Sequence, residues 1–408
     1  MLQRHNENPR RERADDDELV LRNDLVSRAR ELFPLLRKNA ERTDADRRVV
    51  EENVEALKDA GLFRMMVPRR YGGYEANFRT NLEVTSTIAE GCGSTAWVLN
   101  LTSINAWAIS LMSRRAQDDV FGANPDSRAA GVLTPSGSGR RVDGGVRVTG
   151  KWYFASGSLH ANWGLVGFTE VDQDNRPLGQ YMALVRAEEM TLEDTWFTVG
   201  MRGSGSNCFI ANDVYVPAHR ILSVADALAG DYPTPFKDEY VYRAAFVPVA
   251  TIVLAGPQLG LARAALHHVM ETAGKRPIAY TDYMKQSDST AFQLQVAEAA
   301  TKIDAAHLMA WRCTDTIDAA AKEGDKLDLL TRARCRADTG YAIQQVTEAL
   351  QILVSAHGAG TFAQSNPLQR IWRDSNTGAR HAIAMPIVNL EIYGKALLGV
   401  EPNITPLV

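Results

Sequence analysis

The chain has 408 residues, of which 45% are hydrophobic and 23% are charged, and its formal net charge is −4. A chain of this length is too long to fold around one ordinary hydrophobic core, so two or three structural units are expected. The slightly acidic balance lacks the basic footprint of a nucleic-acid-binding protein. The four cysteines are widely scattered, which predicts reduced structural thiols in a cytoplasmic protein rather than a disulfide framework or a metal site.

The N-terminal part is predicted to be helical after a short arm. Residues 1–17 are polar and charged without an apolar stretch, so they do not resemble a signal peptide and are predicted to form a disordered arm. From 18 to 127, apolar residues such as Leu25, Leu32 and Leu36 recur at helical spacing, which predicts an N-terminal helical domain.

The middle of the chain, 128–235, has the composition of a β domain. Segments rich in β-branched and aromatic residues alternate with Gly, Asp, Asn and Pro turns. The predicted strands are 129–133, 146–155, 163–171, 181–185 and 208–216.

The last part, 236–408, is predicted to be a bundle of three or four long antiparallel helices. Two apolar stripes at helical spacing support it: Phe292, Val296, Ala299, Ile303 and Ala306, then Val346, Leu350 and Leu353. The longest apolar run, 244–265, is interrupted by Pro248, Gly256 and Arg263. We interpret it as a buried core helix and not as a membrane span.

Five motifs in the right order resemble the acyl-CoA dehydrogenase family. They are Val67-Pro68-x-x-Tyr71-Gly72-Gly73, Gly131 to Pro135, Gly150 to Ser158, Val199 to Ser206, and Pro367-Leu368-Gln369-Arg370-x-x-Arg373-Asp374. The resemblance implies an α+β fold with an N-terminal helical domain, a central β-barrel-like domain holding the flavin ring, and a C-terminal four-helix bundle.

Two departures from the dehydrogenase pattern indicate a different activity. Where a dehydrogenase carries its catalytic Glu, this chain has Ala382 beside His381, and Ser156-Gly157-Ser158 replaces the usual Thr-Asn. The chain thus resembles the two-component, reduced-flavin-dependent monooxygenases of the aromatic hydroxylase type. That resemblance implies reduced FMN or FAD from a separate reductase, O2 as co-substrate, a flavin hydroperoxide, and a phenolic or polycyclic aromatic substrate. No strand is followed by a nicotinamide-binding glycine motif.

Two residues are the candidate catalytic groups. Histidine titrates near neutral pH and can take a phenolic proton, and the resemblance places His381 at the catalytic corner. Alternatively, His381 only balances the dipole at a helix end. The resemblance also implies that Ser156, or the backbone beside it, contacts nitrogen 5 of the flavin, although Ser156 could equally belong to a plain turn. His160 is the second candidate base.

Further site residues follow from the resemblance. The flavin ring would contact Thr134, Phe154 and Ser156. The flavin phosphate would be held in another subunit by Arg276 and the turn Gly358-Ala359-Gly360, which requires a homo-oligomer, most simply a tetramer; the turn could also be only a helix C-cap. The substrate would contact Asn105, Trp107, His160, Phe236 and Tyr240, although Trp107 could be core and Phe236 and Tyr240 could be plain linker residues.

Three other functions stay open at this level. An N- or S-oxygenating monooxygenase could use the same scaffold. An acyl-CoA dehydrogenase could take its base from Glu391 or Glu239. A non-enzymatic helical scaffold protein could have kept the fold. Neither a nucleic acid nor a membrane is an expected partner.

Overall fold

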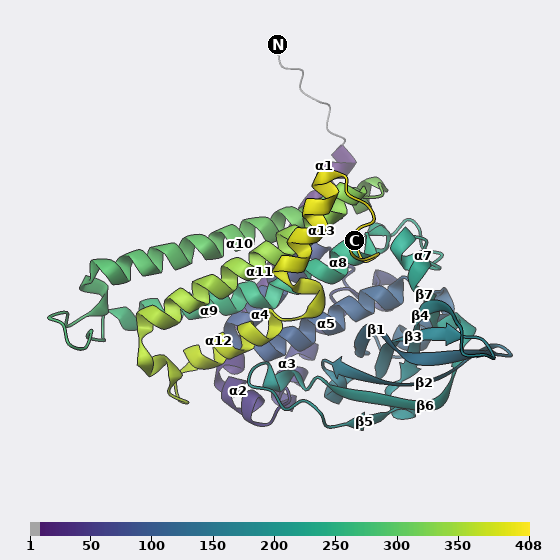
Figure 1. Cartoon of the computed structure of the whole chain (residues 1–408), viewed down its shortest axis with the longest axis horizontal. Helices are drawn as coiled ribbons and strands as arrows, with labels where there is room; N and C mark the ends of the chain where they lie inside the picture. Colours follow the sequence, from purple (N-terminus) through teal and green to yellow (C-terminus); the bar gives the residue numbers. More distant parts are fainter. Residues whose placement is uncertain (1–8) are drawn as a thin grey trace, which may run out of the picture.

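Helices form the first part of the chain (Figure 1). The computed structural model describes residues 9–408. The α-helices ahead of the sheet are α1 (Pro9–Glu31), α2 (Phe33–Ala45), α3 (Glu51–Asp59), α4 (Phe78–Gly91), α5 (Gly93–Ser110) and α6 (Arg114–Phe121). Helix α5 is buried on nearly every face, which is the pattern of a helix in the centre of a protein. The predicted N-terminal helical domain is therefore present.

The start of α1 corrects one prediction. The helix begins at Pro9, so 9–17 are helical where a disordered arm over 1–17 was expected, while residues 1–8 lie outside the described part. The segment includes three Arg, one Glu and one Ala, which are strong helix formers. Proline is tolerated in the first helical turn because its missing N–H would have no partner there.

One mixed sheet follows the helices. Its strands are β1 (Ala129–Val142), β2 (Gly145–Ala155), β3 (Trp163–Val171), β4 (Pro177–Arg186), β5 (Thr191–Glu193), β6 (Asn207–Pro217) and β7 (Ile221–Ser223). The spatial order is β5-β6-β2-β1-β3-β4-β7, and β1 pairs with β3 in parallel while the other pairs are antiparallel. Among residues 9–408, β5 and β7 remain edges, so strand pairing does not close the predicted barrel-like unit.

The C-terminal part is helical, as predicted. It contains α7 (Val224–Ala229), α8 (Phe246–Ile252), α9 (Ala255–Ala273), α10 (Thr290–Glu323), α11 (Leu329–His357), α12 (Pro367–Gly378) and α13 (Pro386–Leu398). In Figure 1, α9, α10 and α11 lie side by side and point away from the sheet. Of the apolar stripe on α10, Phe292, Ala299 and Ile303 are buried.

The stretch Phe246–Ala273, which comprises α8 and α9, is long and apolar enough to cross a membrane. However, 78% of its most apolar window is buried inside the protein. Helix α9 packs against α4, α10, α11 and α12, which explains why its surface is apolar. The prediction of a buried core helix is confirmed.

The helical parts and the sheet domain meet at a small apolar cluster. It contains Trp97 from α5, Met201 from the loop before β6, Leu261 from α9 and Ala379 after α12. This cluster joins segments that are far apart in sequence. Residues that contact it are therefore positioned by the helical parts and the sheet domain together.

Candidate active site

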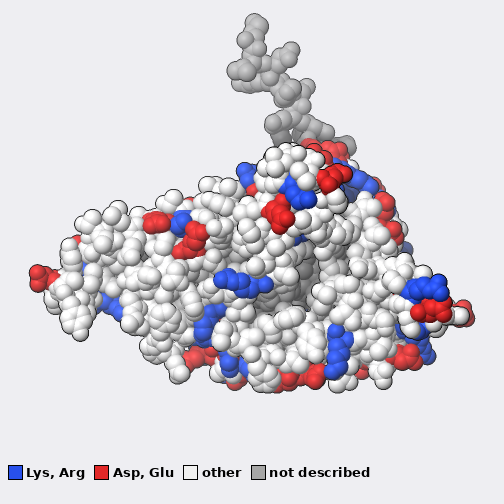
Figure 2. All heavy atoms as spheres, in the orientation of Figure 1, with Lys and Arg blue, Asp and Glu red and all other residues white. Residues whose placement is uncertain are grey.

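A hollow lies at this meeting point. Figure 2 shows it between the bundle and the sheet domain, beside the α12–α13 connection that Figure 1 draws in yellow. The atoms around it belong mostly to uncharged residues, and the charged side chains on this face lie nearer the rim and the edges of the molecule. Such a concave and mostly uncharged surface suits a planar organic ligand.

Ser156 follows the end of β2 and contacts Trp97 of the apolar cluster. The turn needs two residues in the left-handed region, Phe154 with φ 68° and Gly157 with φ 78°. A phenylalanine in that conformation costs of order 1–3 kcal/mol. The strain turns the side chain of Phe154 outward, where it is 70% exposed and meets Trp196 edge-on at 5.9 Å between ring centroids. The predicted ring contact Phe154 is thus an exposed aromatic group.

A chain of hydrogen bonds runs inward from Ser156. Trp97 Nε1 donates to Ser156 Oγ over 3.1 Å, and Ser156 Oγ lies 2.6 Å from Ser206 Oγ. Ser206 Oγ lies 2.7 Å from Ser204 Oγ, which donates to the carbonyl oxygen of Met201 over 2.7 Å. All five residues are buried. The predicted residue Ser156 is therefore one member of an ordered polar network and not an isolated turn residue.

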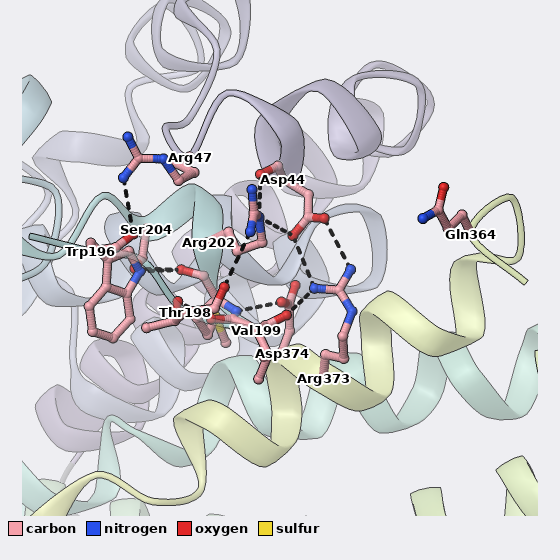
Figure 3. Close-up of polar contacts among 12 residues, drawn as sticks. Asp44, Arg47, Trp196, Thr198, Val199, Arg202, Ser204, Gln364, Arg373 and Asp374 are labelled. Atoms are coloured by element: carbon pink, nitrogen blue, oxygen red, sulfur yellow. Dashed lines mark hydrogen bonds and ion pairs between the residues drawn. The ribbon is translucent and has the colours of Figure 1, made fainter. Parts of the chain in front are cut away.

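The end of this network is fixed by α12 (Figure 3). Met201 has a left-handed φ of 51°, and its N–H donates to Asp374 Oδ1 over 2.6 Å. Burial raises the pKa of Asp374 to about 7, against the opposing effect of the Met201 N–H. The Met201 carbonyl also accepts from Trp196 Nε1 at 2.8 Å. Met201 is thus held through both of its backbone polar groups.

The rest of this loop is held by charged side chains from two other elements. Asp44 of α2 lies between two arginines in Figure 3, with Arg373 Nη2 3.0 Å from its Oδ2 and Arg202 Nε 3.0 Å from its backbone oxygen. Arg373 also donates to the Val199 carbonyl. The family-like Arg373-Asp374 pair is therefore a structural clamp between α12 and the loop 194–206.

His381 stands on the other side of Trp97 from Ser156. Its ring centroid is 6.2 Å from that of Trp97, with an angle of 55° between the planes. The residue is exposed, yet the surrounding protein desolvates the ring and lowers the pKa of His381 below its usual value. Within residues 9–408, its ring nitrogens make no hydrogen bond to protein. A neutral, unpaired imidazole at the edge of the hollow is able to act as a base.

Thr134 lies on β1, where the pairing with β3 shifts register between Val132 and Gly137. The shift allows the carbonyl oxygens of Leu133 and Thr134 to pack against Gly167, where a side chain would come within 2.3 Å and 2.8 Å of them. The side chain of Thr134 remains exposed. The sequence predicts that the strand ends here, because Pro135 and Gly137 are typical of turns.

The predicted phosphate residues are not near Ser156 in the single chain. Arg276 and the turn Gly358-Ala359-Gly360 lie in the connections at the far end of the bundle from the sheet (Figure 1). Arg276 contacts His357 through a hydrogen bond and also lies against Gly360, where a side chain would come within 2.8 Å of Arg276 Nη2. These residues therefore form a second group at the bundle tip.

Two predicted substrate residues are structural. Trp107 is only 1% exposed, its Nε1 donates to Val241 O at 2.9 Å, and its ring packs on Phe78 and Phe246. These contacts agree with the alternative that Trp107 is a core residue, and a role in substrate binding stays a prediction. Asn105 bonds Ala129 O at 3.1 Å, which ties α5 to β1.

The other predicted substrate residues lie in three separate places. Phe236 lies under the guanidinium of Arg70, 3.6 Å from ring centroid to carbon. Tyr240 donates to Glu18 Oε1 at 2.6 Å. His160 Nδ1 is 3.8 Å from Glu51 Oε2, its Nε2 is buried without a partner in the described part, and burial lowers its pKa. None of these contacts brings the three residues together with Ser156.

A separate cavity of about 420 Å³ lies between α2, α9 and α12. Charged groups of both signs line it, including Arg37, Glu271 and Arg370. It includes neither Ser156 nor His381, so this cavity is separate from the centre formed by the hydroxyl network and the histidine.

Sequence reasoning missed three members of the site. Ser204 and Ser206 stand inside the motif Val199 to Ser206, which was recognised only as a fold marker, and Trp97 lies outside all five motifs. Ser156, Ser204 and Ser206 come together only in the folded chain, because β6 pairs with β2 and brings the loop before it to the end of β2. The spacing Ser204-Gly205-Ser206, with Gly205 at φ 52°, is the one local signal for two hydroxyls that share a turn.

Comparison with known proteins gives a consistent set of relatives. The acyl-CoA dehydrogenase N-terminal domain matches 24–121 and the C-terminal domain matches 252–386. The flavin-dependent monooxygenase oxygenase subunit HsaA of Mycobacterium tuberculosis is 34% identical, covering 92% of this chain and 95% of that protein. The oxygenase component of the FADH(2)-dependent resorcinol hydroxylase of Rhizobium sp. is 32% identical, covering 93% and 95%.

A solved structure agrees with these relatives. XiaF from Streptomyces sp., in complex with FADH2 and glycerol, superposes with a TM-score of 0.91 at 36% identity. The match covers 96% of this chain and 99% of that one.

Proposed function

The chain belongs to the acyl-CoA dehydrogenase family and to its flavin-dependent monooxygenases, and on that premise we propose that it hydroxylates an aromatic substrate. It would be the oxygenase component of a two-component system, with a separate reductase supplying reduced flavin. The relatives named above as oxygenase subunits or components support this role.

One observation carries the proposal. His381 is an exposed residue of the α12–α13 connection beside the mostly uncharged hollow, its ring makes no hydrogen bond within the described residues, and desolvation by the surrounding protein lowers its pKa. A neutral imidazole takes a proton from a phenol and so makes its ring electron-rich. An acyl-CoA dehydrogenase, by contrast, would need a carboxylate base, and that base would have to come from Glu239 or Glu391. Glu239 is already paired with Arg70, and Glu391 is an exposed residue of α13.

The residues at the hollow fit a flavin ring. The exposed ring of Phe154 and the partly buried ring of Trp196 beside it offer an apolar platform, and Ser156 offers one hydroxyl with its oxygen partly free. When bound, a reduced flavin supplies the two electrons that activate O2 for transfer of one oxygen atom to the substrate. The protein itself would bind and orient both molecules, exclude water, and accept the substrate proton at His381 Nε2 or Nδ1.

The group at the bundle tip would hold the flavin phosphate of another subunit. Arg276 supplies a cation, and the turn at Gly358 supplies backbone N–H groups. The tip also exposes apolar side chains, with Tyr280, Met284 and Phe362 all more than half exposed, as expected of a surface that a second copy covers. The active unit would therefore be a homo-oligomer, most simply a tetramer.

The cellular setting follows from the thiols. All four cysteines are free and buried, which supports a reducing cytoplasm.

Anaerobic titration tests the proposed function. Reduced FMN or FAD is expected to bind more tightly than the oxidised form, and the protein alone should not oxidise NAD(P)H. Together with a flavin reductase it should convert a simple phenol to a catechol. Tight binding of oxidised FAD, with bleaching of that FAD by an acyl-CoA thioester, would contradict the proposal and restore the dehydrogenase reading.

A further inference from the structure

The hydroxyl chain beside the hollow has only one possible direction. Ser204 Oγ lies 2.7 Å from the Met201 carbonyl oxygen, which carries no proton, so the Ser204 hydroxyl must donate there. Ser204 Oγ is also 2.7 Å from Ser206 Oγ. Because each hydroxyl has one proton, Ser206 must be the donor in that second contact. The same argument makes Ser156 the donor to Ser206 across 2.6 Å.

Ser156 therefore has no proton left for a ligand. Trp97 Nε1 can only donate, and it bonds Ser156 Oγ at 3.1 Å, so one of the two lone pairs is occupied as well. Ser156 is 7% exposed and retains a single lone pair. A ligand atom that meets this hydroxyl favourably must carry a hydrogen.

The far end of the chain prevents a reversal. Reversing it would require Ser204 to release the Met201 carbonyl, and Met201 cannot follow because Asp374 holds its N–H at 2.6 Å. Ser204 and Ser206 are 1% and 3% exposed, so water does not readily replace a lost partner. A buried polar group left without a partner is costly, which keeps the chain in one orientation.

We propose that Ser204 and Ser206 are positioning residues that make the site selective for the redox state of the flavin. Nitrogen 5 of an oxidised flavin is an acceptor, whereas nitrogen 5 of a reduced flavin carries a hydrogen and donates. Ser156 Oγ, which can only accept, matches the N–H at nitrogen 5 of the reduced form. Against the oxidised form it places its lone pair opposite the lone pair of nitrogen 5. This inference rests on the proposed function, because it takes a flavin as the ligand that meets Ser156.

Binding measurements test this without any turnover. Dissociation constants are measured for oxidised FMN and FAD in air and for the reduced forms without oxygen. Ser206→Ala frees the Ser156 proton, so oxidised flavin should bind more tightly and the preference for reduced flavin should fall roughly tenfold or more, the scale of relieving one unpaired buried contact. Ser204→Ala should act in the same direction but less, because either hydroxyl of the remaining Ser156–Ser206 pair can then be the donor.

Three further variants make the result specific. Ser156→Ala should instead weaken the binding of reduced flavin, since the acceptor is gone. Ser206→Thr keeps the hydroxyl and should keep the wild-type preference. Ser158→Ala is the matched control, because Ser158 is buried in the same turn but donates to Gly205 O at 3.0 Å, outside the chain.

The outcomes separate this inference from the proposed function. A wild-type protein that binds neither form of flavin would overturn the proposed function and the inference with it. A wild-type protein that prefers reduced flavin, together with a folded Ser206→Ala variant of unchanged preference, would overturn only the directed hydroxyl chain. If Ser206→Ala does not fold, Ser204→Ala decides the question by the same comparison.

Discussion

The corner around Ser156 and the tip around Arg276 differ in how completely one chain builds them. At the corner, α2, α5, α12 and the loop 194–206 hold one another through buried hydrogen bonds and ion pairs. At the tip, Tyr280 and Met284 are exposed, and nothing lies within 4 Å of a side chain placed at Gly358. Under our proposal, the site for the flavin ring is therefore prepared within one chain, while phosphate recognition is left to a second.

The largest expected effect concerns the chemistry at the corner. His381→Ala should lower product formation by roughly 10²- to 10⁴-fold, the usual loss for a general base, and should raise the hydrogen peroxide released per flavin oxidised. Reduced-flavin binding should remain, because no described contact of the His381 ring supports the fold. Product and peroxide assays decide this, with His160→Ala as the control. Product formation at the wild-type rate in His381→Ala would place the base elsewhere.

An intermediate effect is expected at the tip. Arg276→Ala should weaken the binding of reduced FMN and FAD by about 10- to 100-fold, as for one hydrogen bond to a charged group. Binding of riboflavin, which has no phosphate, should hardly change. The matched control is Lys275→Ala, which removes a charge from the neighbouring position. Equal losses for FMN and riboflavin would show that Arg276 acts on the fold of the tip rather than on phosphate.

The smallest expected effect is a difference in pH dependence between the two regions. The pKa of Asp374 is raised to about 7 from near 4 in the unfolded chain. Between pH 4 and 7 the folded state therefore binds more protons than the unfolded state. The contribution of Asp374 to the free energy of unfolding is complete below pH 4 and is lost as the pH rises to about 7. His357 at the tip has its pKa lowered to about 4, first by burial and then by Arg276. Its contribution is complete above pH 6.5 and lost as pH falls to about 4.

Thermal unfolding between pH 4 and 8 checks these opposite signs. Asp374→Asn should remove part of the decline in Tm on the alkaline side, and His357→Gln should remove part of the decline on the acid side. Asp44→Asn is a suitable control, because it alters the same clamp at a partly exposed carboxylate that is paired with Arg373. Parallel pH profiles for all the variants would contradict the assignment of both groups.

Sequence patterns predicted the architecture well because periodicity reports burial. The strand predicted over 163–171 coincides with β3, and the predicted end of the second bundle stripe coincides with the end of α11 at His357. The sequence predicted that the first strand ends at 133, whereas β1 continues to Val142. The bulge after Val132 is created by packing against β3 and not by local propensity.

The site was predictable only in part. Ser156 and His381 follow from motifs, but the role of Trp97, which lies between them, depends on a contact 59 residues apart in sequence. Trp107 sits ten positions after Trp97 on the same helix, yet it faces Phe78 and Phe246 in the core. A single sequence does not tell which of two tryptophans on an apolar helix contacts Ser156 and which packs in the core.

The buried stretch Phe246–Ala273 has a consequence during synthesis. The helix α11 that packs on it ends at His357, so about 84 residues separate the end of this apolar segment from the end of its cover. At about 5–20 residues per second, a ribosome needs roughly 4 to 17 seconds to make them. Throughout that interval the nascent chain carries a segment with the hydropathy of a membrane span, so correct folding depends on how quickly chaperones or the earlier helix α4 can shield it.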